Sequence, residues 1–203
     1  MAKIITFGEI MLRLKAPGQE RFFQSPGLEA TFGGGEANVA VSLAHLGCDV
    51  SYLTAVPENP IGRAALAQLR GYGVDVSRCR VEKDGRLGIY FLENGACARP
   101  SVVVYDREES CISRCGAGSF DWKSIFSDAL LFHVTGITPA RCSAVRSGMR
   151  RIWSVCPCWK SFPRPQSLLK AMTLHFAGVF PRRRIHSLLP VKNRSVRPMW
   201  AVR

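Results

Sequence analysis

Three consecutive glycines, Gly33 to Gly35, lead directly into a run with helical periodicity, and this junction could bind a polar ligand. Glycine permits positive φ and lets a ligand approach the backbone, because it has no Cβ. The free N–H groups and the positive dipole end of the following helix would point toward that ligand. Asn38, in the first turn, adds an amide that suits paired hydroxyl groups. A plain turn before a helix explains the glycines equally well, so the flanking residues must decide.

Tyr90, Tyr105 and Arg107 form a second group that could bind a ligand, on two later predicted strands. Tyr105 and Arg107 are two residues apart, which places them on one face of an extended segment. An aromatic ring can pack on the C–H surface of a sugar acid while a guanidinium forks onto its carboxylate. Tyr90 could add a hydroxyl from the neighbouring strand. From residue types alone, an ordinary surface ion pair between Arg107 and one of the two glutamates after it is the more frequent explanation.

Glu9 directly follows the first predicted strand, Ile4 to Phe7, which is short, apolar and β-branched. Open α/β sheets bind ligands at the carboxyl ends of their strands. Glu9 is therefore either a ligand contact or a solvated loop carboxylate. His133 lies inside another apolar run, 130–134, and we expect a core histidine there rather than a catalytic base.

The segments that would position these residues alternate between strand and helix. The helix entered from the glycines has Gly47 as its C-cap, and a strand over 50–55 follows. Asn59 and Pro60 then supply an N-cap and a first-turn proline for a second helix. This order predicts an α/β fold with a parallel sheet covered by helices. The expected buried stripes are Val39, Leu43 and Leu46 in the first helix and Ile61, Ala65 and Leu69 in the second.

The second part of the chain continues this alternation. Strands are expected over 87–92, 102–105 and 130–134. A short helix over 121–126, with Ser119 as its cap, should precede the last of them.

Several segments resemble the ribokinase-like, or PfkB, carbohydrate kinases, and in particular their 2-keto-3-deoxygluconate kinase branch. The segments that carry the resemblance are Lys3 to Leu14, Ala30 to Leu46, Leu87 to Glu93, Val103 to Arg107 and Phe132 to Ala140. The resemblance covers Met1 to about Ala140. It implies a ribokinase-like α/β fold with a partial parallel sheet, in which 12–14 and 22–31 form strands of a small β lid.

The resemblance also implies a function and a set of contacts. The function would be ATP-dependent phosphorylation of 2-keto-3-deoxygluconate, with ATP and Mg²⁺ bound by the intact family member, which is often homo-oligomeric. Glu9 would replace an Asp that contacts the sugar. Another sugar kinase of the family, such as a fructokinase, is the alternative, although Arg107 favours an acidic substrate. The implied substrate-binding residues are Gly34, Asn38, Tyr90, Tyr105 and Arg107.

The last part of the chain, 141–203, differs sharply from the first. Residues 1–140 carry 14 Lys and Arg against 15 Asp and Glu, whereas 141–203 carry 14 Lys and Arg and no acidic residue. The tail also contains six prolines and three of the four tryptophans. This abrupt break favours translation in a wrong reading frame, giving a disordered or out-of-frame tail. The alternative is a basic module that binds nucleic acid, at most nonspecifically since no nucleic-acid motif is legible.

The family's Gly-Ala-Gly-Asp segment supplies its catalytic Asp and anion hole, beside the ATP site, and no such run occurs in this sequence. We therefore expect 1–140 to be the substrate-binding half of a sugar kinase. No catalytic, ATP-binding or metal-binding residue is expected, and the chain alone should be inactive. The alternative from a different class is a non-catalytic sugar-acid binder, or a non-catalytic hybrid whose basic tail binds nucleic acid.

The compartment is predicted from what the sequence contains. We see no secretory signal and no apolar run of about 18 residues, so a cytoplasmic protein without a membrane partner is expected. Its eight cysteines should then remain reduced. Cys156 and Cys158, taken with Cys142, fit no zinc-site spacing.

Overall fold

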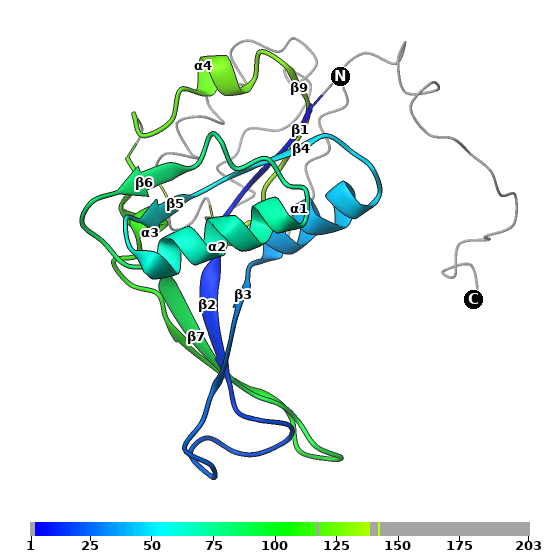
Figure 1. Cartoon of the computed structure of the whole chain (residues 1–203), viewed down its shortest axis with the longest axis vertical. Helices are drawn as coiled ribbons and strands as arrows, with labels where there is room; N and C mark the ends of the chain where they lie inside the picture. The colour runs from blue at the N-terminus through cyan, green and yellow to red at the C-terminus, as the bar shows by residue number, and fades with distance from the viewer. Residues whose placement is uncertain (1–2, 117, 139–141, 143–203) are drawn as a thin grey trace, which may run out of the picture.

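The structure, a computed structural model, describes residues 3–116, 118–138 and 142 (Figure 1). Apart from Cys142, the predicted basic tail lies outside the described residues. In chain order the elements are β1 (Lys3–Phe7), β2 (Met11–Lys15), β3 (Glu29–Gly33), α1 (Gly35–His45), β4 (Val50–Leu53), β5 (Ala55–Pro57), α2 (Pro60–Gly71), β6 (Arg80–Glu82), β7 (Gly88–Glu93), β8 (Val102–Asp106), α3 (Cys111–Arg114), α4 (Trp122–Ile125) and β9 (Ala129–His133).

A parallel sheet with the strand order β4-β1-β9 lies at the centre of the described fold. This arrangement confirms the predicted parallel sheet. Because parallel strands end at the same edge, the residues that follow them meet there. Glu9, Thr54 and Thr135 come after β1, β4 and β9, and they mark that edge.

Helical segments cover both faces of this sheet, and strand residues alternate between the two cores. Val50 and Tyr52 face the core under α1 and α2, whereas Phe7 and Leu53 face the core under α3 and α4. Figure 1 shows α1 and α2 crossing the sheet on the viewer's side. The helix residues of the first core are Ala37, Ala40, Ala65, Leu66 and Leu69, and those of the second are Cys111, Ile112, Trp122 and Ile125.

The predicted buried stripe of α1 is correct only in part, because Leu43 packs against the core but Leu46 does not. Leu46 is 79% exposed, and Val39 and Leu43 are only partly buried. The face that packs on the sheet instead presents Ala37 and Ala40. Small side chains let the helix backbone approach β1 and β4 closely, so the fully buried apolar positions of α1 are alanines, while the partly buried Leu43 packs against the same core.

The predicted stripe of α2 is correct in part. Ala65 and Leu69 are buried, but Ile61 is 45% exposed. Gly62 and Leu66 complete the buried face, one residue further along the helix than expected. A Cβ at Gly62 would overlap the carbonyl oxygen of Pro57, so glycine allows the first turn to pack against β5.

The predicted helix ends are mostly confirmed. Gly47 has a φ of +81°, the left-handed conformation expected after a helix. The Asn59 side chain accepts a hydrogen bond from the Gly62 N–H at 2.9 Å, as an N-cap does. The cap predicted for α4 is wrong, because Asp121 accepts from the Ser124 N–H while the Ser119 hydroxyl accepts from Gly116.

A second sheet, with the strand order β3-β2-β7-β8, projects from the layered part as the lid (Figure 1). β2 runs antiparallel to β3 and parallel to β7, and β7 runs antiparallel to β8. The predicted strand over 22–31 is wrong for most of its length, since β3 begins only at Glu29. Phe23 has a φ of 62° within the preceding turns, which an extended strand does not allow.

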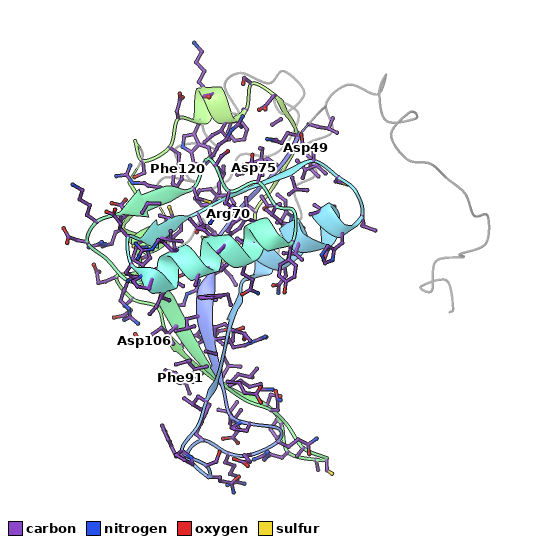
Figure 2. All side chains as sticks on the ribbon, in the orientation of Figure 1. Asp49, Arg70, Asp75, Phe91, Asp106 and Phe120 are labelled. Atoms are coloured by element: carbon purple, nitrogen blue, oxygen red, sulfur yellow. The ribbon has the colours of Figure 1, made fainter. Side chains whose placement is uncertain are left out.

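Figure 2 places Phe91 and Asp106 along the lid, and Asp49 and Asp75 near the amino-terminal ends of β1 and β4. The lid therefore lies toward the carboxyl edge of the central sheet. Within the described part of the chain, no helix is both long and apolar enough to cross a membrane.

Candidate functional site

The start of α1 packs against the residue that follows β1. Gly34 is the N-cap of α1 with a φ of −176°, and a Cβ there would overlap the Glu9 carbonyl oxygen. Gly33 and Gly35 also lie outside the positive-φ region, so the chain does not use the positive φ that these glycines permit. The glycine at 34 allows close approach of backbone to backbone, and the space beside it is filled by Glu9.

The other two glycines have different surroundings. A Cβ at Gly33 would lie 3.0 Å from the Tyr90 hydroxyl, so that hydroxyl sits over the end of β3. A Cβ at Gly35 would meet only the Thr135 methyl group, at 3.8 Å. Gly33 therefore connects the helix start to the lid, and Gly35 faces the loop after β9.

The lid register brings polar and aromatic side chains into one row. Tyr90 pairs with Tyr105 across β7 and β8, and Arg13 of β2 pairs with Tyr90 on the other side. Directly opposed residues point to the same face of a sheet. The two tyrosine rings have centroids 5.9 Å apart, and Tyr105 is 58% exposed.

Arg107 lies just beyond the end of β8, with its Cζ 5.6 Å from the centroid of the Tyr105 ring. The structure thus brings together Tyr90, Tyr105 and Arg107, the three residues singled out on the lid strands. A guanidinium at this distance from an aromatic face makes a favourable cation–π contact.

Arg107 forms an ion pair with Glu9. The Arg107 Nε donates to Glu9 Oε2 at 2.9 Å, and Nη2 donates to the same oxygen. The exposed fractions of the two side chains are only 11% and 6%. Neither simple explanation for these residues holds, because Glu9 is not a solvated carboxylate and Arg107 does not pair with the glutamates after it.

The pairing leaves part of the guanidinium available. Glu9 occupies the edge that contains Nε, whereas Arg107 Nη1 makes no hydrogen bond with the residues that the structure describes. An arginine has five N–H donors in a planar fork, and its terminal edge can bind a carboxylate. The arrangement can therefore hold an anionic group beside the two tyrosines.

Residues 1–147 match the pfkB family of carbohydrate kinases. The chain belongs to this family. A 2-dehydro-3-deoxygalactonokinase from Haloferax volcanii is 37% identical over 145 residues, which are 71% of this chain and 45% of that protein. A 2-dehydro-3-deoxygluconokinase from Thermoproteus tenax is 34% identical over 143 residues, which are 69% of this chain and 43% of that protein.

The fold comparison agrees with the sequence comparison. The crystal structure of a 2-dehydro-3-deoxygluconokinase from Thermotoga maritima superposes with a TM-score of 0.72 and 43% identity, and the match covers 76% of this chain and 48% of that one. This confirms the resemblance to the PfkB kinases and the ribokinase-like α/β fold. The pfkB chain spans about half the length of the relatives it matches.

A buried carboxylate that the sequence analysis did not single out ties α1 of this pfkB chain to the loop after β9. Glu36 is only 4% exposed. Its Oε1 accepts from the Thr135 N–H at 3.0 Å, the Thr135 hydroxyl at 2.6 Å and the Thr138 hydroxyl at 2.8 Å. Three donors on one carboxylate oxygen hold the Thr135 loop against the helix start. An acidic residue in the first turn of a helix was the available signal.

A cavity of about 420 Å³ lies between α1, α2 and the base of the lid. Asn38 lines it from an exposed position, and Gly33 and Arg13 line it from the lid side. Arg13 was missed by sequence reasoning, although its place in β2 two residues after Met11 puts it on the face that Tyr90 shares. The predicted site residues therefore fall into two groups: Asn38 lines the cavity, and Tyr90, Tyr105 and Arg107 lie together on the lid, where Arg107 pairs with Glu9.

The residues described by the structure include no group of three or more His, Cys, Asp or Glu side chains that could hold a metal ion.

Proposed function

We propose that the described residues are the substrate-binding part of an ATP-dependent kinase for 2-keto-3-deoxygluconate, also named 2-dehydro-3-deoxygluconate. The observation that carries this proposal is the Nη1 side of the Arg107 guanidinium, which makes no hydrogen bond with the described residues. The Arg107 Cζ lies 5.6 Å from the centroid of the Tyr105 ring, which in turn lies 5.9 Å from that of Tyr90. A bound sugar acid would place its carboxylate on the Nη1 side. Its C–H surface would then pack on the tyrosine rings.

The remaining predicted contacts have distinct roles in this proposal. Asn38, exposed beside the cavity, would hydrogen-bond sugar hydroxyls through its amide. Gly34 would act indirectly, because it lets the start of α1 reach Glu9 and so brings the helix N-terminus close to the site. Residues 1–140 form the proposed substrate-binding unit.

The phosphoryl donor would be ATP, which the carbohydrate kinases of this family use. Phosphoryl transfer depends on positioning and on stabilising charge around the transferred group. The described residues would contribute the first of these, by fixing the sugar acid on the lid. By the family resemblance, the general base and the anion hole for the transferred phosphoryl group would come from the Gly-Ala-Gly-Asp segment.

The names of the relatives support a six-carbon keto-deoxy sugar acid as the substrate class. Those proteins are named as 2-dehydro-3-deoxygalactonokinase and 2-dehydro-3-deoxygluconokinase. A fructokinase is the alternative within the family. The buried arginine favours the acid, because a neutral sugar would leave the Nη1 edge of Arg107 without an anionic partner.

The first prediction concerns Arg107→Ala. We expect calorimetric titration to show that the chain binds 2-keto-3-deoxygluconate, and that this variant binds it about ten- to a hundredfold more weakly, since a hydrogen bond to a charged group contributes about 1.5–3 kcal/mol. D-Fructose should bind the parent more weakly than the acid. Equal affinity of parent and variant for the acid would refute the role of Arg107, and tighter binding of fructose would favour the fructokinase alternative.

A further inference from the structure

We infer that Glu9 is a positioning residue, which holds Arg107 by its Nε edge and so presents the terminal edge to the substrate carboxylate. This inference rests on the proposed function. Glu9 would not touch the reacting atoms. It would instead determine how the arginine that recognises the acid is oriented.

The hydrogen bonds define which edge is held. Both Nε and Nη2 of Arg107 donate to the same oxygen, Glu9 Oε2. A planar guanidinium bound through that side can rotate little about its Cδ–Nε bond, so the direction of Nη1 is set. Tyr105 restricts the same group from its face, with Cζ 5.6 Å from the ring centroid.

Glu9 itself is held by the core. The Tyr52 hydroxyl donates to the Gly8 carbonyl at 2.8 Å, and the Gly8 N–H donates to Leu53 at 3.1 Å. Gly34 packs against the Glu9 carbonyl, where no larger residue fits. The orientation of the Arg107 side chain is therefore fixed by the end of β1, which carries Glu9, and not by β8 alone.

The second Glu9 oxygen is also informative. Oε1 is buried and has no hydrogen-bond partner among the described residues, and a Cβ at Gly88 would overlap it. Leaving a carboxylate oxygen without a partner is costly, so this carboxylate is not arranged for stability alone. Among the described residues, the hydrogen bonds that the Glu9 carboxylate accepts are the two that orient Arg107.

The pair also explains how a lone cation tolerates burial before the ligand arrives. An unpaired buried charge is strongly unfavourable, and Glu9 neutralises Arg107 in the empty site. The carboxylate of a bound sugar acid would then bind the Nη1 side of the guanidinium, while Glu9 keeps the Nε side. A neutral sugar would gain none of this interaction, so the pair contributes to specificity.

The experiment is a double-mutant cycle on the full 203-residue chain, read as affinity for 2-keto-3-deoxygluconate. Glu9→Ala should weaken binding at least about tenfold in the parent background and less than about twofold in the Arg107→Ala background. Glu9→Gln, which keeps one acceptor oxygen, should stay within about threefold of the parent. A purely structural role would lower affinity similarly in both backgrounds, and that result would overturn the inference.

Asp106→Asn is the matched control, because it disrupts another arginine–carboxylate pair on the same lid. Arg86 Nη1 lies 2.7 Å from Asp106 Oδ1 at an exposed position. We expect this variant to bind the acid like the parent. Loss of affinity in the control as large as in Glu9→Ala would overturn the inference.

A second readout does not depend on the ligand. In ¹⁵N-labelled chain, the Arg107 Nε–H should exchange with water at least about tenfold more slowly in the parent than in Glu9→Ala. Equal exchange rates would overturn the inference even if the acid binds. Failure of the parent to bind any sugar acid would instead overturn the proposed function and the carboxylate role together, while the exchange rates still show whether Glu9 holds Arg107.

Discussion

Neighbouring glycines at the start of α1 make different demands on the fold at the scale of single residues. Gly34 is buried against the Glu9 carbonyl, whereas Gly35 is exposed and has ordinary van der Waals space around its Cα. Glycine is therefore required at 34, where a Cβ would clash, but not at 35, where a Cβ has room.

We predict that Gly34→Ala destabilises the chain by about 3 kcal/mol or more, because its Cβ would overlap backbone atoms that cannot move aside. Gly35→Ala should change the free energy of unfolding by less than about 1 kcal/mol, and in the stabilising direction, since alanine is the better helix former. Urea unfolding followed by circular dichroism measures both. Similar stability of the two variants would contradict the close packing of Gly34 on Glu9.

The cysteines provide a second prediction at this scale. Burial raises the pKa of the Cys79 thiol to about 12, and its Sγ lies 3.1 Å from the Tyr52 carbonyl oxygen. Cys97, by contrast, is exposed on the lid. Since only the thiolate reacts with alkylating agents, we expect iodoacetamide to modify Cys97 at least about a hundredfold faster than Cys79.

Peptide mass spectrometry after timed labelling checks this order. In denaturant the two cysteines should react at similar rates, which provides the internal control. Rapid labelling of Cys79 without denaturant would show that the α1–α2 side of the core is open in solution.

At the scale of elements, Lys3 connects β1 to the segment that follows α2. Its Nζ lies 2.8 Å from Asp75 Oδ2, at the end of the sheet remote from the lid (Figure 2). Burial alone would raise the pKa of Asp75, but the hydrogen bonds from Lys3 and Ser77 outweigh it and hold that pKa well below its usual value. The folded state therefore favours the ionised carboxyl.

This lowered pKa predicts a pH dependence with a definite sign. Because folded Asp75 binds a proton less tightly than unfolded Asp75 does, its ionised carboxylate stabilises the folded state fully above about pH 4, the ordinary pKa of an Asp side chain. This stabilisation is lost as the pH falls further toward the lowered pKa of the folded state. We expect Lys3→Met to lower the free energy of unfolding by about 1 kcal/mol at neutral pH. The difference from the parent should shrink by about pH 2.

Unfolding curves collected from neutral to acidic pH measure this effect. Asp106→Asn, which removes an exposed ion pair, is the comparison, and it should change the dependence of the free energy of unfolding on pH less than Lys3→Met does. A Lys3→Met deficit that persists unchanged in acid would contradict the role of the Lys3–Asp75 pair.

At the scale of the whole molecule, the central question is whether binding and catalysis are both present in 203 residues. The described part provides a sheet, a lid and the proposed site around Arg107, and the chain spans about half the length of its relatives. By the family resemblance, the base and the anion hole are expected in a Gly-Ala-Gly-Asp segment. The 203 residues contain no such run.

We therefore predict that this polypeptide, assayed as it stands with ATP and 2-keto-3-deoxygluconate, turns over at least about a hundredfold more slowly than a longer chain carrying that segment. Loss of a general base alone typically costs about 10²–10⁴ in rate, and loss of one anion-hole donor costs about 10²–10³. A coupled ADP-release assay on both chains measures the difference. Turnover within a hundredfold of the longer chain would contradict the hypothesis that this chain binds the sugar acid but lacks the catalytic residues. Sequencing the gene through codon 140 would test the separate hypothesis that the tail is translated in a wrong reading frame.

Much of the fold and part of the site followed from the sequence by itself. The Asn59 cap and the turn at Gly47 were predictable because they depend on residues close in the chain, whose φ preferences and side-chain oxygens act locally. The order of strands and helices likewise predicted the parallel sheet. On the lid, the two-residue spacing and the strand pattern pointed to Tyr105 and Arg107 as neighbours.

Only the tertiary structure decided what those residues contact. Glu9 and Arg107 are far apart in the chain, and their pairing requires the end of β1 to meet the end of β8. Gly34 is needed because α1 starts against Glu9, and Ala37 and Ala40 face the core because the helix lies close to the sheet. Such contacts depend on how elements pack against one another, and neither periodicity nor local conformational preference encodes that packing.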